Sequence, residues 1–126
     1  MILGVDPGRD KCGLALMDEN QIIEVQEVVA TEQVIDRVEE LASEYKVDNV
    51  VIGDGTSSSE LINKLGCNNF EIHQVDETNS TLEARKLYWQ ENPPSGWRRL
   101  VPISFQTPPE AVDDYVAVIL IRRFLK

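Results

Sequence analysis

The stretch at residues 2–16, Ile-Leu-Gly-Val-Asp-Pro-Gly-Arg-Asp-Lys-Cys-Gly-Leu-Ala-Leu, decides the fold. An apolar run ends in one acid, Asp6, and Pro7 and Gly8 follow at once. Proline removes a backbone donor and glycine tolerates positive φ, so this pair favours a tight turn. A second apolar run, residues 14–17, begins just past the turn. The pattern predicts two strands joined by a short turn, with a carboxylate on the last residue of the first strand.

Asp6 itself admits two interpretations. It is either an ordinary exposed aspartate of a turn or a metal-binding acid at the edge of a sheet. A buried strand that ends in a lone carboxylate is costly unless the charge meets a metal, another cation or water. The local pattern alone leaves both interpretations open.

Length and composition predict one compact domain, residues 1–126. Hydrophobic residues make up 42% of the chain, which is enough for a core. The chain enters a strand at once and its longest apolar run, residues 116–121, is too short to span a bilayer, so we expect no signal peptide and no membrane partner. Cys12 and Cys67 lack metal-type spacing, which fits a reduced, cytoplasmic setting. The single histidine, His73, excludes an HExxH zinc site, and it is expected on a strand, facing solvent or a helix.

Hydrophobic spacing and turn signals predict the remaining elements. The expected elements are, in order, a strand at 21–29, a helix from its N-cap Thr31 to about residue 46, a strand at 49–53, a helix at 57–65, a strand at 70–75, a helix at 81–91 and a last helix at about 111–125. Ser80 and Glu83 fit a capping box, and the proline-rich segment 93–110 is expected to be a loop. The order predicts an α/β fold in which helices flank a mixed five-stranded sheet, with a three-strand antiparallel meander and two parallel strands.

Acidic side chains follow the predicted parallel strands where each strand ends. Asp6, Asp54 and the pair Asp76-Glu77 would lie at one sheet edge, and the last helix can bring Asp113-Asp114 to the same place. Clustered carboxylates need protons or cations to coexist. Oxygen ligands without Cys or His select Mg²⁺ or Mn²⁺, and such ions support phosphodiester hydrolysis without a histidine base. Taken singly, Asp54 is also typical of a turn, and the acids at 113–114 are also typical of a first helical turn.

The charge of the chain is uneven. The net charge is −10, which argues against a generic nucleic-acid binder. Residues 1–84 hold 5 Lys and Arg against 18 Asp and Glu, whereas residues 85–126 hold 7 against 4. This basic end offers either a phosphate-facing patch or side chains that merely complement helix dipoles and meet solvent. Its members are Arg85, Lys86, Arg98, Arg99, Arg122, Arg123 and Lys126, and Trp97 adjoins two of them.

Three segments of the chain match a known family. They are Leu3-Gly4-Val5-Asp6-Pro7-Gly8 with Gly13-Leu14-Ala15-Leu16, then Asp76-Glu77-Thr78-Asn79-Ser80-Thr81-Leu82-Glu83-Ala84-Arg85, and then Val112-Asp113-Asp114-Tyr115-Val116-Ala117-Val118-Ile119-Leu120-Ile121. In these segments the chain resembles the YqgF family, RNase H-like proteins described as pre-ribosomal 16S RNA processing nucleases and as Holliday junction resolvases. The resemblance covers most of the chain.

The resemblance implies a metal-dependent nuclease acting on structured RNA or branched DNA. Asp113 rather than Asp114 matches the family's last acid, because it keeps the offset to Ala117. The implied cofactor is Mg²⁺ or Mn²⁺, the implied partner is nucleic acid, and the protein would be a monomer or a homodimer. The implied catalytic residues are Asp6, Glu77 and Asp113. The metal-ligand candidates are the same three acids together with Asp54 and Asp114. The nucleic-acid-binding candidates are Arg85, Arg98, Arg99 and Lys11.

The chain departs from the family's pattern around this site. Arg9-Asp10 replaces the family's Thr-Lys, and Thr78 replaces an arginine. After the fourth strand the family has a Gly-Leu-Pro loop with a longer insert, where this chain has a shorter segment with Asp54. Other RNase H-like nucleases place a metal ligand at that point.

Three functions remain as hypotheses. The first is a divalent-metal-dependent endonuclease. The second is a non-catalytic nucleic-acid-binding or ribosome-assembly module on the same fold. The third is a nucleotide-binding lobe of the actin and sugar-kinase type, which also uses a first-strand Asp-x-Gly turn near phosphate, although 126 residues leave no room for a second lobe.

Overall fold

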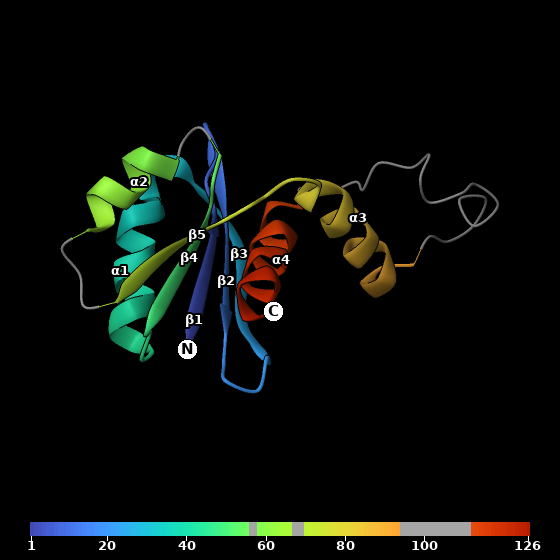
Figure 1. Cartoon of the computed structure of the whole chain (residues 1–126), viewed down its shortest axis with the longest axis horizontal. Coiled ribbons are helices and arrows are strands. Elements are labelled where there is room, and N and C mark those ends of the chain that lie inside the picture. Colours follow the sequence, from blue (N-terminus) through green and yellow to red (C-terminus); the bar gives the residue numbers. More distant parts are fainter. Residues whose placement is uncertain (56–57, 67–69, 94–111) are drawn as a thin grey trace.

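Five strands form one mixed sheet in the computed structural model, which describes residues 1–55, 58–66, 70–93 and 112–126 (Figure 1). The sheet order is β3-β2-β1-β4-β5. The first three strands pair antiparallel, while β1 pairs parallel with β4, and β4 with β5. The predicted fold class is therefore confirmed. The strands are β1 (Ile2–Asp6), β2 (Lys11–Met17), β3 (Ile23–Ala30), β4 (Asn49–Gly53) and β5 (Glu71–Val75).

Helices cover both faces of the sheet. Figure 1 shows α1 and α2 on one face and α4 on the other, with α3 beside α4. Side chains alternate between the two faces along each strand, so Leu3 and Val5 pack with α1 and α2, whereas Gly4 lies under α4. The described part of the chain contains no helix long and apolar enough to cross a membrane. The helices are η1 (Thr31–Gln33, 3₁₀), α1 (Val34–Glu44), α2 (Ser58–Leu65), α3 (Ser80–Glu91) and α4 (Asp113–Leu125).

Two predicted helix caps are wrong. Thr31 does not cap α1, because it begins the 3₁₀ turn η1 and its hydroxyl donates 2.9 Å to the carbonyl of Gly8, across the β1–β2 turn. Ser80 is the first residue of α3 and is buried, and no capping box forms. Instead Asn79 takes the N-cap position with a φ of 62°, in the left-handed region that asparagine tolerates.

Two further expectations concern the histidine and the proline-rich segment. The ring of His73 on β5 lies 4.7 Å from that of Phe124 on α4, so His73 faces a helix, one of the two predicted placements. The predicted loop at 93–110 falls almost wholly outside the described residues, as does Cys67. Cys12 is a buried free thiol on β2.

Helix α4 crosses the strands in close contact with the sheet. A Cβ on Gly4 of β1 would overlap the carbonyl of Ala117 and the side chain of Ile121. Near the N-terminus of the helix, the Asp113 backbone lies against β2 at Gly13, and further along Leu120 reaches Gly53 at the end of β4. Such close packing is possible because glycine presents no side chain. The helix thereby reaches the sheet edge at which β1, β4 and β5 end.

Candidate functional site

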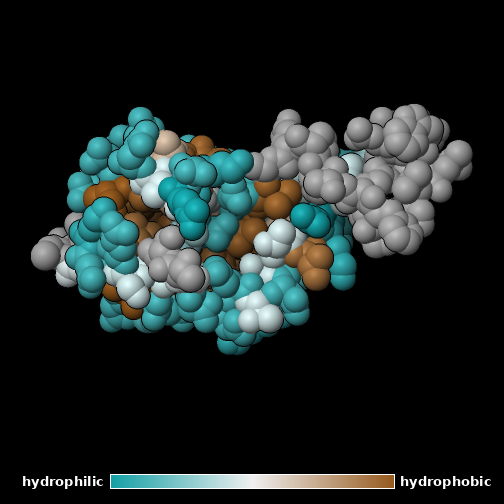
Figure 2. Space-filling model, turned by 90° about the horizontal axis from the view of Figure 1, so that it is seen from above, coloured by the Kyte–Doolittle hydropathy of each residue, from teal (hydrophilic) through white to brown (hydrophobic). Residues whose placement is uncertain are grey.

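Asp6 is the last residue of β1 and lies on the α4 face of the sheet. It shares that face with Gly4, two residues earlier, because side chains alternate along a strand. Its partner across the antiparallel pair is Gly13 on β2. Figure 2 views this end of the molecule from above, where hydrophilic residues dominate and apolar patches show between them. The carboxylate thus lies at the carboxyl edge of the parallel strands, as predicted.

Asp113 reaches Asp6 because the N-terminus of α4 lies on Gly13. The carbonyl carbon and oxygen of Asp113 fill the space that a Cβ on Gly13 would occupy. Since Gly13 is the direct partner of Asp6, this contact brings the first residue of α4 beside the last residue of β1. Sequence reasoning did not assign Gly13 a role in the site. A glycine within an apolar strand often marks the close approach of another backbone, and this signal would have identified Gly13.

Glu77 follows β5, and its carboxylate lies over the end of β4. Both carboxylate oxygens approach the positions where side chains on Gly53 and Gly55 would begin. The backbone amide of Glu77 donates 3.2 Å to Oδ1 of Asp54, which is exposed in the turn after β4. The sequence places Gly53 at the end of a buried strand and Gly55 just past it, but it does not reveal that the carboxylate of Glu77 would cover them.

Neighbouring charges act on each of the three acids, and Asp6 is affected by both of the others. Burial, then the charge of Asp113, then that of Glu77 raise the pKa of Asp6 to about 7. Burial also raises the pKa of Glu77, with Asp54 and Asp76 adding to the effect. The pKa of Asp113 is raised by burial and by Asp114, although Lys11 acts in the opposite direction. The sheet edge therefore concentrates negative charge that only protons or cations can relieve.

Asp113 also has a buried oxygen without a hydrogen bond. Among the described residues, Oδ2 of Asp113 is buried and has no hydrogen-bond partner. The ammonium of Lys11 is 3.9 Å away, close enough for an ion pair but beyond hydrogen-bond distance. An unpartnered carboxylate oxygen in a cluster of acids is suited to a hard cation.

The donor set fits Mg²⁺ or Mn²⁺ better than a transition metal that prefers nitrogen or sulfur. Within residues 1–55, 58–66, 70–93 and 112–126, no group of three or more Asp, Glu, His or Cys side chains is arranged to hold a metal ion. Mg²⁺, however, is commonly bound by one or two carboxylates, with water and substrate phosphates completing its shell. Asp6 with Asp113, or Asp6 with Glu77, would supply two such carboxylates, since the charges of Asp113 and Glu77 both act on Asp6.

The two other predicted metal ligands lie at the edge of this cluster. Asp54 is exposed and accepts the hydrogen bond from the amide of Glu77. Asp114, the second residue of α4, accepts a 3.0 Å hydrogen bond from Nε2 of Gln26 on β3. Asp54 therefore supports the segment that carries Glu77, whereas the Asp114 carboxylate is engaged with β3.

The predicted nucleic-acid-binding residues fall into three groups. Lys11, at the start of β2, is exposed and pairs with Asp113. Arg85 is partly buried on α3, the helix that follows Glu77. Arg98 and Arg99 lie outside the described residues, as does Trp97. Of these candidates, the described residues place only Lys11 in contact with one of the three acids.

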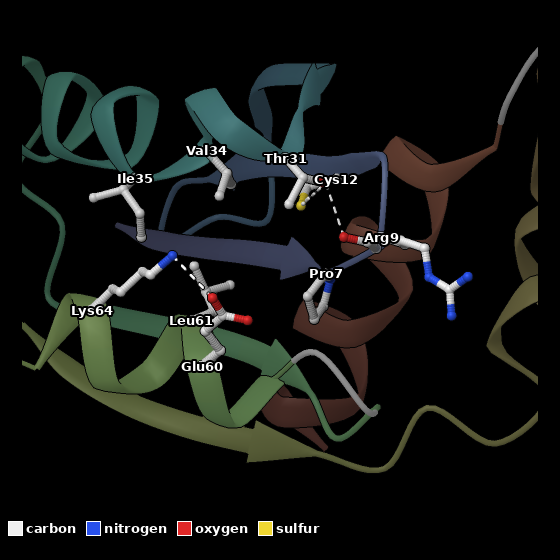
Figure 3. A pocket seen from close by; sticks show the side chains of 10 residues that line it. Pro7, Arg9, Cys12, Thr31, Val34, Ile35, Glu60, Leu61 and Lys64 are labelled. Carbon is white, nitrogen blue, oxygen red and sulfur yellow. Dashed lines mark hydrogen bonds and ion pairs between the residues drawn. The ribbon is translucent and has the colours of Figure 1, made fainter.

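A cavity of about 200 Å³ opens between the β1–β2 turn and the helices α1 and α2, on the face of the sheet opposite α4 (Figure 3). Pro7, Val34 and Leu61 give it apolar walls, and Lys64 at its rim pairs with Glu60 at 3.1 Å. None of the acids of the site lines it. The cavity belongs to the layer of α1 and α2 and is separate from the acids at the sheet edge.

Comparisons with known proteins agree with the fold and the motifs. The sequence model of a family described as "RuvX: Holliday junction resolvase" matches residues 1–126. No protein with a curated description matches the sequence. Among solved structures, the RuvC structure from Thermus thermophilus is similar, with a TM-score of 0.54 and 10% identity over 98% of this chain and 94% of that one. At this identity the likeness concerns the fold alone.

Proposed function

The chain belongs to the RuvX family of Holliday junction resolvases, which are nucleases, and we propose that it cleaves phosphodiester bonds with divalent metal ions held by Asp6, Glu77 and Asp113. The observation that carries this proposal is the meeting of acids at one sheet edge, where the Asp113 backbone lies on Gly13, the strand partner of Asp6, and Oδ2 of Asp113 is buried without a hydrogen-bond partner. In agreement with that geometry, burial, Asp113 and Glu77 together raise the pKa of Asp6 to about 7. A carboxyl group in that state exchanges its proton for a cation readily near neutral pH.

Each of the three acids contributes from a different element. Asp6 comes from the end of β1, Glu77 from the segment after β5, and Asp113 from the first turn of α4. A bound Mg²⁺ or Mn²⁺ would lower the pKa of a water molecule and offset the negative charge of the reacting phosphate. Lys11, beside Asp113, would contact a neighbouring phosphate of the same strand.

We take branched DNA as the substrate, because the family is described by its action on Holliday junctions. Processing of pre-ribosomal RNA is the alternative within the same chemistry. A junction presents two strands for cleavage, which favours a homodimer over a monomer. A reduced, cytoplasmic setting is part of the same proposal, since the thiol of Cys12 is free.

The test is cleavage of a labelled panel with and without Mn²⁺ or Mg²⁺. The panel holds a four-way DNA junction, the matching linear duplex, and a structured RNA with a 5′ extension. We expect metal-dependent cleavage of the junction, a loss of at least 100-fold in Asp6→Asn, and full activity in Asp36→Asn, an exposed acid of α1. An Asp6→Asn protein with wild-type activity would overturn the proposal, and cleavage of the RNA alone would reassign the substrate.

A second candidate, a non-catalytic nucleic-acid-binding or assembly module, is favoured by one observation. No three potential ligands among the described residues are arranged to hold a metal ion. Under this alternative, the wild type binds the junction or the RNA equally well with chelator or with Mn²⁺ and cleaves neither. Metal-dependent cleavage that is lost in Asp6→Asn excludes it.

A further inference from the structure

Arg123, near the end of α4, joins that helix to the segment between β5 and α3. Its Nη1 donates 2.7 Å to the carbonyl of Asp76, and its Nη2 donates 2.8 Å to the carbonyl of Thr78. Nη2 also donates to Oε1 of Glu83 on α3, at 3.0 Å. The side chain is 19% exposed. The guanidinium thus binds three acceptors within the protein.

The two carbonyls that Arg123 binds belong to the residues on either side of Glu77. The same short segment is closed from within, because Oδ1 of Asp76 accepts hydrogen bonds from the amide of Thr78 at 3.0 Å and from its hydroxyl at 2.7 Å. The amide of Glu77 is held in turn by Asp54. The backbone that presents the Glu77 carboxylate is therefore fixed by its own turn, by the end of β4 and by α4.

Helix α4 carries Asp113 at its other end. Asp113 and Arg123 are separated by roughly 15 Å of helix, at the rise of an ordinary α-helix. The helix is anchored between them, since residues 116–121 are buried. One rigid element therefore presents Asp113 to Asp6 and also holds the segment that presents Glu77 to Asp6.

We propose that Arg123 is a positioning residue of the acidic site, which fixes Glu77 relative to Asp6 and Asp113 by binding the carbonyls of Asp76 and Thr78. This inference rests on the proposed function, because its consequence is measured as metal affinity. The alternative is an arginine that only complements the dipole of its helix. That role does not require acceptors on another segment, whereas all three side-chain partners of Arg123 lie outside α4.

The chemistry of the contact requires arginine. A planar guanidinium presents several donors in a fixed fork and so binds two carbonyls and a carboxylate at once. A lysine ammonium is a single point charge on a flexible stem. We therefore expect Arg123→Lys to retain part of the effect and Arg123→Met to lose it.

The test measures Mn²⁺ affinity by calorimetry and amide hydrogen exchange without metal, on the full chain. We expect Arg123→Met to weaken Mn²⁺ binding 10- to 100-fold, the usual effect of removing a group that orients a ligand. We expect Arg123→Lys to fall between that variant and the wild type. Arg122→Met is the matched control, because Arg122 is an exposed neighbour on the same helix, and it should bind Mn²⁺ as the wild type does.

Hydrogen exchange separates positioning from a general loss of stability. We expect the amides of residues 77–80 to exchange at least tenfold faster in Arg123→Met, while those of β1 and β4 keep their wild-type rates. Equal acceleration throughout the sheet would show a merely structural role and overturn the proposal. So would wild-type exchange at residues 77–80, or wild-type Mn²⁺ affinity in Arg123→Met.

The two proposals fail in different ways. If the wild type itself binds no Mn²⁺, the metal-dependent function fails, and the exchange rates still decide whether Arg123 fixes the Glu77 segment. If the wild type binds Mn²⁺ and Arg123→Met binds it equally well, only the positioning role fails. A double-mutant comparison adds a further check, because Arg123→Met should have little additional effect on Mn²⁺ affinity in a Glu77→Gln protein.

Discussion

The backbone carbonyl of Asp113 occupies the space in which a side chain on Gly13 would begin. Gly13 is in turn the direct strand partner of Asp6. A single residue without a side chain thus allows the first turn of α4 to lie beside the end of β1. The electrostatic coupling between Asp6 and Asp113 follows from this contact.

Replacement of Gly13 by alanine should therefore damage both stability and the site. The new methyl group would overlap backbone atoms, which cannot move without shifting the N-terminus of α4. We expect a loss of about 1–3 kcal/mol in the free energy of unfolding, measured by urea denaturation. Gly66→Ala is the control, since the nearest atom to its added methyl is 3.4 Å away, and its stability should change by less than about 1 kcal/mol. Equal stability of Gly13→Ala and the wild type would contradict the contact.

The raised pKa of Asp6 predicts how stability changes with pH when no metal is present. In the unfolded chain the carboxyl group titrates at 3.8, whereas in the folded chain it titrates at about 7. Between these values the folded state holds the proton more tightly, so stability should fall as pH rises from about 4 to 7 and then level off. We expect Asp6→Asn to show a smaller fall, since only the contributions of Glu77 and Asp113 remain, and to be more stable than the wild type at pH 8 by up to roughly 4 kcal/mol.

The measurement is urea denaturation between pH 4 and 8.5 in the presence of a chelator. Asp36→Asn, on an exposed face of α1, should retain the wild-type dependence. If wild type and Asp6→Asn change in parallel across this range, the carboxyl group of Asp6 is not the one that titrates.

The sheet was predictable because its signals are local. The Asp6-Pro7-Gly8 turn, the alternation along the first strands and the apolar run of β4 each determine an element without reference to the rest of the chain. The convergence of Asp6 and Glu77 followed from topology, since parallel strands end at one edge, and the last helix was expected to bring Asp113 to the same place. Their roles in catalysis stay predictions.

The remaining features depend on contacts between distant segments. Thr31 matches the sequence pattern of an N-cap, but its hydroxyl binds Gly8 across the β1–β2 turn. Ser80 matches a capping box, but it is buried after a left-handed Asn79. Arg123 matches a basic helix end, but it binds the segment around Glu77. In each case a partner that is remote in sequence determines what the side chain does.

Lys11 lowers the pKa of Asp113 against the effects of burial and of Asp114. Lys11→Met should therefore raise the pKa of the Asp113 carboxyl group, as measured by carbon NMR titration of the side chain. Lys64→Met is the control, because Lys64 pairs with Glu60 on the opposite face of the sheet. A downward shift of the Asp113 pKa in Lys11→Met, or the same shift in both variants, would contradict the assigned pair.

Gly55 has a more specific role than Gly13, because only the carboxylate of Glu77 lies where its side chain would begin. A flexible carboxylate can move aside, whereas a backbone cannot. We expect Gly55→Ala to change the free energy of unfolding by less than about 1 kcal/mol and yet to weaken Mn²⁺ binding roughly tenfold. Calorimetry and urea denaturation of the same samples measure both quantities. Wild-type Mn²⁺ affinity in Gly55→Ala would show that the position of Glu77 is unimportant for metal binding.

The most direct test of the account is calorimetric titration of Mn²⁺ into the wild type, Asp6→Asn, Asp113→Asn and the control Asp36→Asn. Asp6, at the end of β1, and Asp113, at the start of α4, are both proposed to bind the same metal site. Shared binding of the metal by Asp6 and Asp113 predicts that the wild type and Asp36→Asn bind with the same affinity, while Asp6→Asn and Asp113→Asn each bind at least tenfold more weakly. Wild-type affinity in Asp6→Asn, or no Mn²⁺ binding by the wild type, would contradict it.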